Sequence, residues 1–167
     1  EWGSIAMPAA PKDNAVAVSV LTKSLLELGL QSHESDKAFL DNALSSISAA
    51  LGADFTGVMR NIDGRWTTVT SIGSAGSSGE LSAGFLADAL DSDQPVRTEG
   101  WIAAAVDRRG AAGEVLIVHA AEVAQAERLR GLVQQILPTF AHAAAAVRTA
   151  GREQRRRRRL EALLTIS

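Results

Sequence analysis

The chain contains no cysteine and no tyrosine among its 167 residues. The absence of cysteine excludes disulfide bonds, cysteine-liganded zinc, iron–sulfur clusters, a thiol nucleophile and a thioether-linked chromophore. It is typical of proteins in a reducing compartment, so we predict a cytoplasmic location. Aromatic side chains are also scarce, at 4% of the residues, whereas 46% of the residues are hydrophobic. The core must therefore be built mainly from alanine, valine, leucine and isoleucine.

Neither sign of charge dominates the chain. It has 17 Lys and Arg against 19 Asp and Glu, a formal net charge of −2, which gives no overall attraction to nucleic acids or to membrane surfaces. No apolar run approaches the roughly 20 residues that a membrane-spanning helix needs. We therefore expect neither a membrane nor a nucleic acid among the direct partners.

The pattern of apolar residues predicts an alternation of helices and strands. Helical spacing and capping residues mark three helical segments before the C-terminal region, and β-rich alternation marks five strands, two of which flank an Asp63-Gly64 turn. The expected helices cover residues 14–28, 35–52 and 81–90, and the expected strands cover 54–62, 65–72, 96–98, 101–106 and 113–119. We predict an α+β fold with a central antiparallel sheet of about five or six strands. Terminal helices would pack on one face, and a short helix and loops would cover the other.

The last part of the chain, residues 121–167, is predicted to be one long helix. Apolar or small residues recur there in alternating steps of four and three, the spacing of a coiled-coil seam. They are Leu129, Val133, Ile136, Phe140, Ala143, Val147 and Ala150. We predict a homodimer whose interface contains Leu129, Val133, Ile136, Phe140 and Val147, together with the helix 14–28. The expected domain organisation is a linker over 1–12, one domain over 13–150, and over 151–167 the start of a helical linker to a downstream domain.

Five consecutive arginines, Arg155 to Arg159, stand within that linker, before a new apolar stripe that begins at Leu160. Clustered positive charge attracts phosphates, which suggests nucleic-acid binding. However, five successive residues of a helix point in all directions and make no single recognition face. No aromatic residue lies among them for base stacking. The alternative, a solvated helical collar, is the interpretation that we favour.

A small-molecule pocket is predicted between the sheet and the Gly/Ser-rich segment 73–79. This segment lacks the spacing of the known phosphate-binding loops, so we favour a plain loop over a phosphate cradle. Tryptophans on the predicted strands are the best aromatic candidates for the pocket, although a place in the core is the alternative that we favour for them. The candidate ligand-binding residues are Arg60, Trp66, Thr68, Ser71, Phe85, Arg97 and Trp101. If Arg60 or Arg97 is buried without a carboxylate, an anionic ligand is expected.

The sequence gives no sign of catalysis or of a metal centre. His33, His119 and His142 lie on different segments at no metal-ligand spacing, and no Gly-x-Ser-x-Gly elbow follows a strand. We therefore predict a protein that is not an enzyme and holds neither a metal nor a cofactor.

At this level of detail the chain resembles a GAF domain. The resemblance is carried by the residues 39–59, the Asp63-Gly64 hairpin, the segments 81–96 and 101–119, and the exit helix 129–148. It departs from the family at Ala104-Ala105-Val106, where an apolar-Pro-Leu ending is usual. The cysteines of bilin-binding and methionine-sulfoxide-reducing members are absent, as is the pattern of Asn-Lys followed at a distance by Phe-Asp-Glu in cyclic-nucleotide-binding members.

The resemblance implies a non-catalytic sensory module of a multidomain bacterial signalling or transcription-regulatory protein. Such a module would couple binding of a small molecule or partner to an output domain through its C-terminal helix. The alternative is a module of the same fold without a ligand that serves as a dimerisation spacer. A pocket filled by Trp66, Phe85 and Trp101 would favour this alternative.

Overall fold

A computed structural model describes residues 11–31, 35–75, 81–107 and 112–166. The fold is α+β, and its sheet has five antiparallel strands in the order β2-β1-β5-β4-β3. The predicted fold class is confirmed. The helices are α1 (Pro11–Leu30), α2 (Asp36–Leu51), α3 (Ala83–Asp91) and α4 (Ala126–Ile166), with a short 3₁₀ helix over Val123–Gln125. The strands are β1 (Ala53–Ile62), β2 (Arg65–Gly73), β3 (Val96–Thr98), β4 (Trp101–Asp107) and β5 (Ala112–Ala120).

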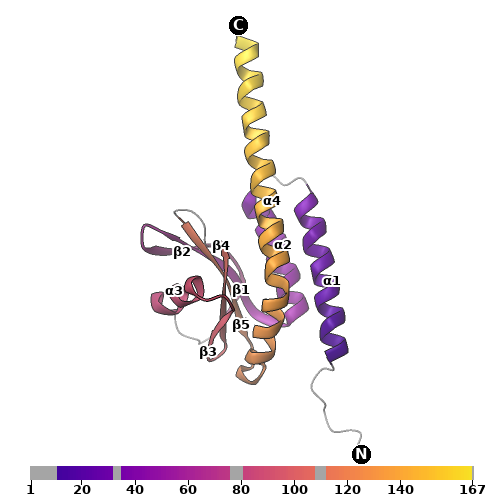
Figure 1. The fold of residues 1–167 in the computed structure, drawn as a ribbon, viewed down its shortest axis with the longest axis vertical. Helices are drawn as coiled ribbons and strands as arrows, with labels where there is room; N and C mark the ends of the chain where they lie inside the picture. The colour runs from indigo at the N-terminus through magenta and orange to yellow at the C-terminus, as the bar shows by residue number, and fades with distance from the viewer. Residues whose placement is uncertain (1–10, 32–34, 76–80, 108–111, 167) are drawn as a thin grey trace, which may run out of the picture.

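The elements form layers on the two faces of the sheet (Figure 1). Helices α2 and α4 pack on one face, α1 packs on the outside of α2 and α4, and α3 lies against the opposite face. Each face has its own apolar cluster: a large one beneath α2 and α4, and a smaller one beneath α3. Helix α4 continues past the body of the domain, so that its C-terminal end stands alone in solvent. No described helix is both long and apolar enough to cross a membrane.

The Asp63-Gly64 hairpin predicted from the sequence is confirmed. Asp63 and Gly64 have φ angles of 54° and 81°, which fit the type I′ turn that joins twisted antiparallel strands. The Gly64 backbone N–H also donates to Oδ1 of Asn61 at 2.9 Å. The turn sets the register in which Ile62 pairs with Arg65.

The first helix is longer at both ends than the sequence indicated. It begins at Pro11, so residues 11 and 12 are helical and not part of a linker; the rest of that predicted linker, 1–10, lies outside the described residues. It also runs through Gly29 to Leu30, beyond the predicted end at residue 28. A Cβ atom at Gly29 would lie 2.9 Å from Cβ of Ala143. The glycine is therefore needed for the close approach of α1 to α4.

The residues predicted to form a dimer seam are instead part of the core of the single chain. Their exposed fractions are 7% or less, and the ring of Phe140 stacks on that of Phe39 in α2 at a centroid distance of 6.4 Å. The corrected residues are Leu129, Val133, Ile136, Phe140 and Val147. The prediction was wrong because steps of three and four mark any buried helical stripe, whether its partner is another chain or the chain's own sheet.

A short polar contact connects α2 to the edge strand β2. The Thr70 hydroxyl donates to Oδ1 of Asp41, and Nζ of Lys37 lies 3.0 Å from Oδ2 of the same carboxylate. The hydrogen bond from Thr70, followed by that from Lys37, holds the pKa of Asp41 below its ordinary value of 3.8. A lowered carboxyl pKa stabilises the folded state above the pKa of the unfolded chain, and this contribution disappears as the pH falls through the folded-state pKa.

We predict that Thr70→Val raises the pKa of Asp41 toward 3.8, because the strongest stabilising contact of the carboxylate is lost. An NMR titration of the Asp41 carboxyl carbon measures the change. In urea unfolding, the wild type should have a higher free energy of unfolding than Thr70→Val at a pH above the unfolded-state pKa of Asp41. The part of this difference that comes from the contact should shrink as the pH falls through the folded-state pKa. Thr68→Val, an exposed site on the same strand, is the control and should leave the Asp41 titration unchanged. An unaltered Asp41 titration in Thr70→Val would contradict this account.

Candidate functional site

The seven residues predicted to bind a ligand are divided between the two faces of the sheet. Five of them, Trp66, Thr68, Ser71, Phe85 and Trp101, lie on the face that α3 covers. Trp66, Phe85 and Trp101 pack against the cluster beneath α3, and Thr68 pairs with Met59, which packs against the same cluster.

Ser71 is placed on this face by its neighbour across the strand. It pairs with Gly57, and a Cβ atom at Gly57 would lie 3.3 Å from that of Ser71 and from a ring atom of Phe55. Thr68 and Ser71 are both exposed. They therefore lie at the rim of this face, outside the apolar cluster.

Apolar side chains occupy the space between the sheet and α3. Leu86 and Ala89 of α3 are buried against Val115 and Ile117 of β5, and the predicted pocket aromatics pack around them. The segment 76–80, which contains most of the predicted Gly/Ser roof, lies outside the described residues. In the part that is described, Trp66, Phe85 and Trp101 pack against the cluster beneath α3 and act as core.

A histidine at the edge of this cluster is held by its neighbours. Nδ1 of His119 lies 2.7 Å from Oδ1 of Asp54, and the Trp101 ring meets the imidazole edge-to-face at 4.5 Å. Nε2 lies close to Gly100, where a Cβ atom would be only 2.9 Å away. The backbone thus lies against the second ring nitrogen, and the hydrogen-bonded pair connects the end of β5 to the start of β1.

The other two predicted pocket residues, Arg60 and Arg97, lie on the opposite face of the sheet. Arg97 pairs with Ile102, whose side chain belongs to the large cluster beneath α2 and α4. Its Nε lies 3.8 Å from Glu127 in α4. Arg130 donates hydrogen bonds to Oε1 of the same Glu127 carboxylate. These hydrogen bonds, and to a smaller degree the charge of Arg97, lower the pKa of the Glu127 carboxyl. Grouping Arg97 with the tryptophans was therefore wrong.

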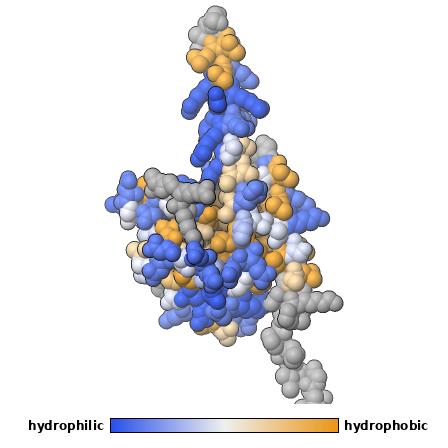
Figure 2. Space-filling model, in the orientation of Figure 1, coloured by the Kyte–Doolittle hydropathy of each residue, from blue (hydrophilic) through white to orange (hydrophobic). Residues whose placement is uncertain are grey.

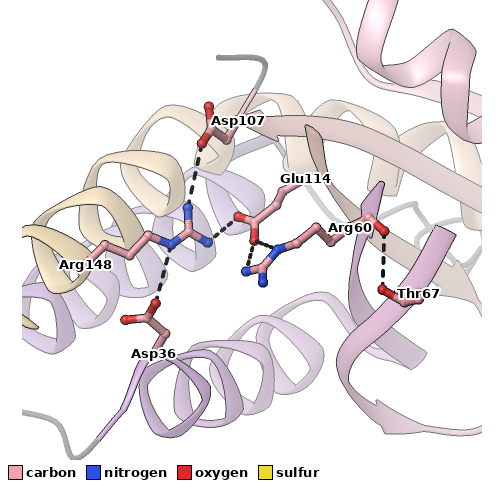
Figure 3. A network of polar contacts seen from close by, with 6 residues as sticks. All are labelled: Asp36, Arg60, Thr67, Asp107, Glu114 and Arg148. Carbon is pink, nitrogen blue, oxygen red and sulfur yellow. Dashed lines mark hydrogen bonds and ion pairs between the residues drawn. The ribbon is translucent and has the colours of Figure 1, made fainter. Parts of the chain in front are cut away.

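Arg60 belongs to a charged cluster between the sheet and the helices (Figure 3). Its Nε donates to Oε2 of Glu114 on β5 at 2.9 Å, and Nη2 donates to the same oxygen. Oε1 of Glu114 accepts from Nη2 of Arg148 on α4. The Glu114 side chain is only 3% exposed, so two guanidinium groups compensate one buried carboxylate. The expectation that a buried arginine without a carboxylate would mark an anionic ligand is not met here.

Arg148 connects three elements at the point where α4 leaves the body. Its other nitrogens lie 3.8 Å from Asp36, at the start of α2, and 3.8 Å from Asp107, at the end of β4. Neither Glu114 nor Arg148 was singled out from the sequence. The available signal was a lone acidic residue inside the apolar run of β5, because such a residue needs a buried cation.

An open groove of about 760 Å³ lies beside this cluster. Its walls come from the end of α1, the start of α2, the strands β1 and β2, and α4 where it leaves the body. The lining residues are Gln31, Ser35, Asp36, Lys37, Arg60, Val69, Val147, Ala150, Gly151, Gln154, Arg155 and Arg158. Sequence reasoning missed this groove because its walls come from segments that are far apart in the chain.

The described side chains that line the groove are mainly charged or polar. Within residues 11–31, 35–75, 81–107 and 112–166, no group of three or more His, Asp or Glu side chains is placed to hold a metal ion. Of the predicted histidines, His142 is exposed on α4 and His33 lies outside the described residues. The groove combines arginine and lysine side chains with small apolar patches, an arrangement suited to binding anions.

Comparison with known proteins adds no assignment. A scan against protein-family models finds no match, and a search of curated proteins finds no significant relative. We therefore infer function from the geometry of the described residues.

We predict that Glu114→Gln lowers the free energy of unfolding by about 3 kcal/mol, because Arg60 and Arg148 lose their shared buried anion. Urea denaturation followed by circular dichroism measures the change. Glu161→Gln, which neutralises an exposed carboxylate on the distal part of α4, is the control and should change stability by less than about 0.5 kcal/mol. A loss below about 1 kcal/mol for Glu114→Gln, the range of exposed ion pairs, would show that the cluster is not an anchor.

Proposed function

We propose that the chain is a non-catalytic regulatory module of the GAF type, acts in the cytoplasm, and transmits the packing state of its body through α4. The order of its elements and its antiparallel sheet support the GAF resemblance. The observation that carries the proposal is that one continuous helix has two different environments. One side of α4 is packed into the core up to Val147, whereas every residue from Arg152 to Thr165 is exposed. A small change in how the body packs against α4 would therefore displace the exposed distal segment of the helix.

The distal segment of α4 carries an exposed apolar surface through which its displacement can affect a second chain. Leu160, Leu163 and Leu164 are exposed and adjacent on the helix, beyond the arginine run, where Figure 2 shows an apolar tip above a hydrophilic collar. Residues three and four apart lie on one face of a helix. We infer that this stripe pairs with the same stripe of a second copy, because exposed contiguous apolar patches mark interaction surfaces.

The first helix provides a second surface for the same pair. Val16, Val20 and Leu26 on α1 are exposed, although α1 packs on α4 through its other side. A homodimer through α1 and the distal part of α4 would bury both surfaces. This proposal replaces the predicted seam, whose residues are occupied within the chain.

The choice between a ligand sensor and a ligand-free spacer depends on the region beneath α3. There the packing of Trp66, Phe85 and Trp101 against the small cluster favours a structural role. We therefore do not place a ligand beneath α3 in this proposal. The relay through α4 requires only that the body can hold α4 in more than one way.

We expect sedimentation velocity to show a reversible dimer of the full chain. Replacement of Leu160, Leu163 and Leu164 by Ser should raise the dissociation constant at least about tenfold, since apolar area is lost from both copies. The control is Val123→Ser, which removes an exposed apolar side chain outside α1 and the distal part of α4. The proposed pairing is refuted if the wild-type chain stays monomeric at all concentrations, or if the triple variant associates as tightly as the wild type.

A further inference from the structure

The groove beside the charged cluster is not used in the proposed relay. One long wall is formed by Gln31 and by the residues 35–37, and the other by the part of α4 from Val147 to Arg158. Arg60 and Val69 of the sheet lie at its base. Its volume of about 760 Å³ falls in the range of small-molecule sites, roughly 300–1,000 Å³.

Positive charge dominates the described part of the groove lining. Among the described lining residues, four are cationic, namely Lys37, Arg60, Arg155 and Arg158, and one, Asp36, is acidic. Lys37 is paired with Asp41 and Arg60 with Glu114. Arg155 and Arg158 form no ion pair with any residue that the structure describes. Two guanidinium groups are therefore available to a ligand.

Helical spacing selects these two arginines from the run of five. Gly151, Arg155 and Arg158 follow Val147 on the face of α4 that lines the groove, at the steps of four and three that keep residues on one face. Nη1 of Arg155 lies 3.4 Å from the position that a Cβ atom of Gly151 would take. The guanidinium thus lies back along α4 toward the body. Arg156, Arg157 and Arg159 do not line the groove.

Arg60 contributes a third guanidinium from the base of the groove. Its Nε and Nη2 are used by Glu114, and Nη1 donates to no described residue. Because Glu114 is buried, the Arg60 fork is held in place, and less side-chain freedom is lost when a ligand binds. The apolar side chains of Val69 and Val147 exclude water from part of the lining, which strengthens charge-assisted hydrogen bonds.

We propose that this groove binds a small anion that carries two or more phosphate groups. Planar guanidinium forks match phosphate oxygens in pairs, and cations on α4 and at the base of the groove require a ligand with more than one anionic group to reach both. A bound polyphosphate would connect α4 to β1 and to the start of α2, so it would favour the arrangement in which α4 is held against the body. Binding of this kind goes beyond the proposed relay and does not require the chain to form a dimer.

Isothermal titration calorimetry of the full chain with inorganic tripolyphosphate tests the inference, at an ionic strength of about 0.15 M. The groove variant is Arg155→Gln with Arg158→Gln. The control variant is Arg156→Gln with Arg159→Gln, which removes the same charge from the same run but outside the groove. All four residues are exposed, and circular dichroism verifies that both variants remain folded.

We expect saturable binding by the wild-type chain, a loss of at least about tenfold in affinity for the groove variant, and a loss below about threefold for the control. Equal losses in the two variants would overturn the inference, because the probe would then respond to the arginine run as a whole. Binding of a duplex DNA without binding of tripolyphosphate would also overturn the inference. Absence of heat up to about 1 mM tripolyphosphate would also overturn it. Sedimentation velocity without the anion reports the dimer separately, so failure of one proposal can be distinguished from failure of the other.

Discussion

The buried carboxylate of Glu114 is the constraint on which the arrangement of this domain depends. It lies at 3% exposure between two arginines from different elements, Arg60 on β1 and Arg148 on α4. A buried charge without partners costs several kcal/mol, so the sheet and α4 must meet in the one orientation that brings both guanidinium groups to it. Arg148 extends this constraint to Asp36 and Asp107. The direction in which α4 leaves the body is thereby fixed by charge as well as by apolar packing.

This arrangement gives the two faces of the sheet different roles. Beneath α3, small and aromatic apolar side chains close the face. Beneath α2 and α4, the apolar cluster ends at the charged cluster, and the groove begins there. The part of α4 that is packed and the part that is free meet at this same place, between Val147 and Arg152. Any molecule that alters the charge balance in the groove therefore acts where a small change in the direction of α4 becomes a large displacement of its distal end.

The fold was largely predictable from the sequence because its signals are local. The Asp63-Gly64 pair fixes a hairpin by its own backbone preferences, and alternation and helical spacing locate the remaining strands and helices. The functional region was less predictable because it depends on which elements meet. The alternation of side chains along β1 puts Arg60 on the same face of the strand as Thr56 and Val58, and these two residues are buried beneath the helices. Without the strand order, however, nothing in the sequence indicates that Glu114 pairs beside Arg60. The stripe through Val133 and Phe140 was misassigned for a related reason, since periodicity shows that a face is buried but not what buries it.

The most direct test of the central claim measures how rigidly Glu114 holds the distal part of α4. The chain has no cysteine, so Arg65→Cys on β2 and Glu161→Cys on α4, both at exposed positions, would carry the only two spin labels. Their distance distribution can be recorded by pulsed electron paramagnetic resonance after dilution with unlabelled chain, which suppresses contributions between copies. We predict one narrow distribution in the chain that retains Glu114, and a broadened or shifted distribution when Glu114→Gln is added. Identical distributions in the two proteins would contradict the claim that the buried carboxylate directs α4.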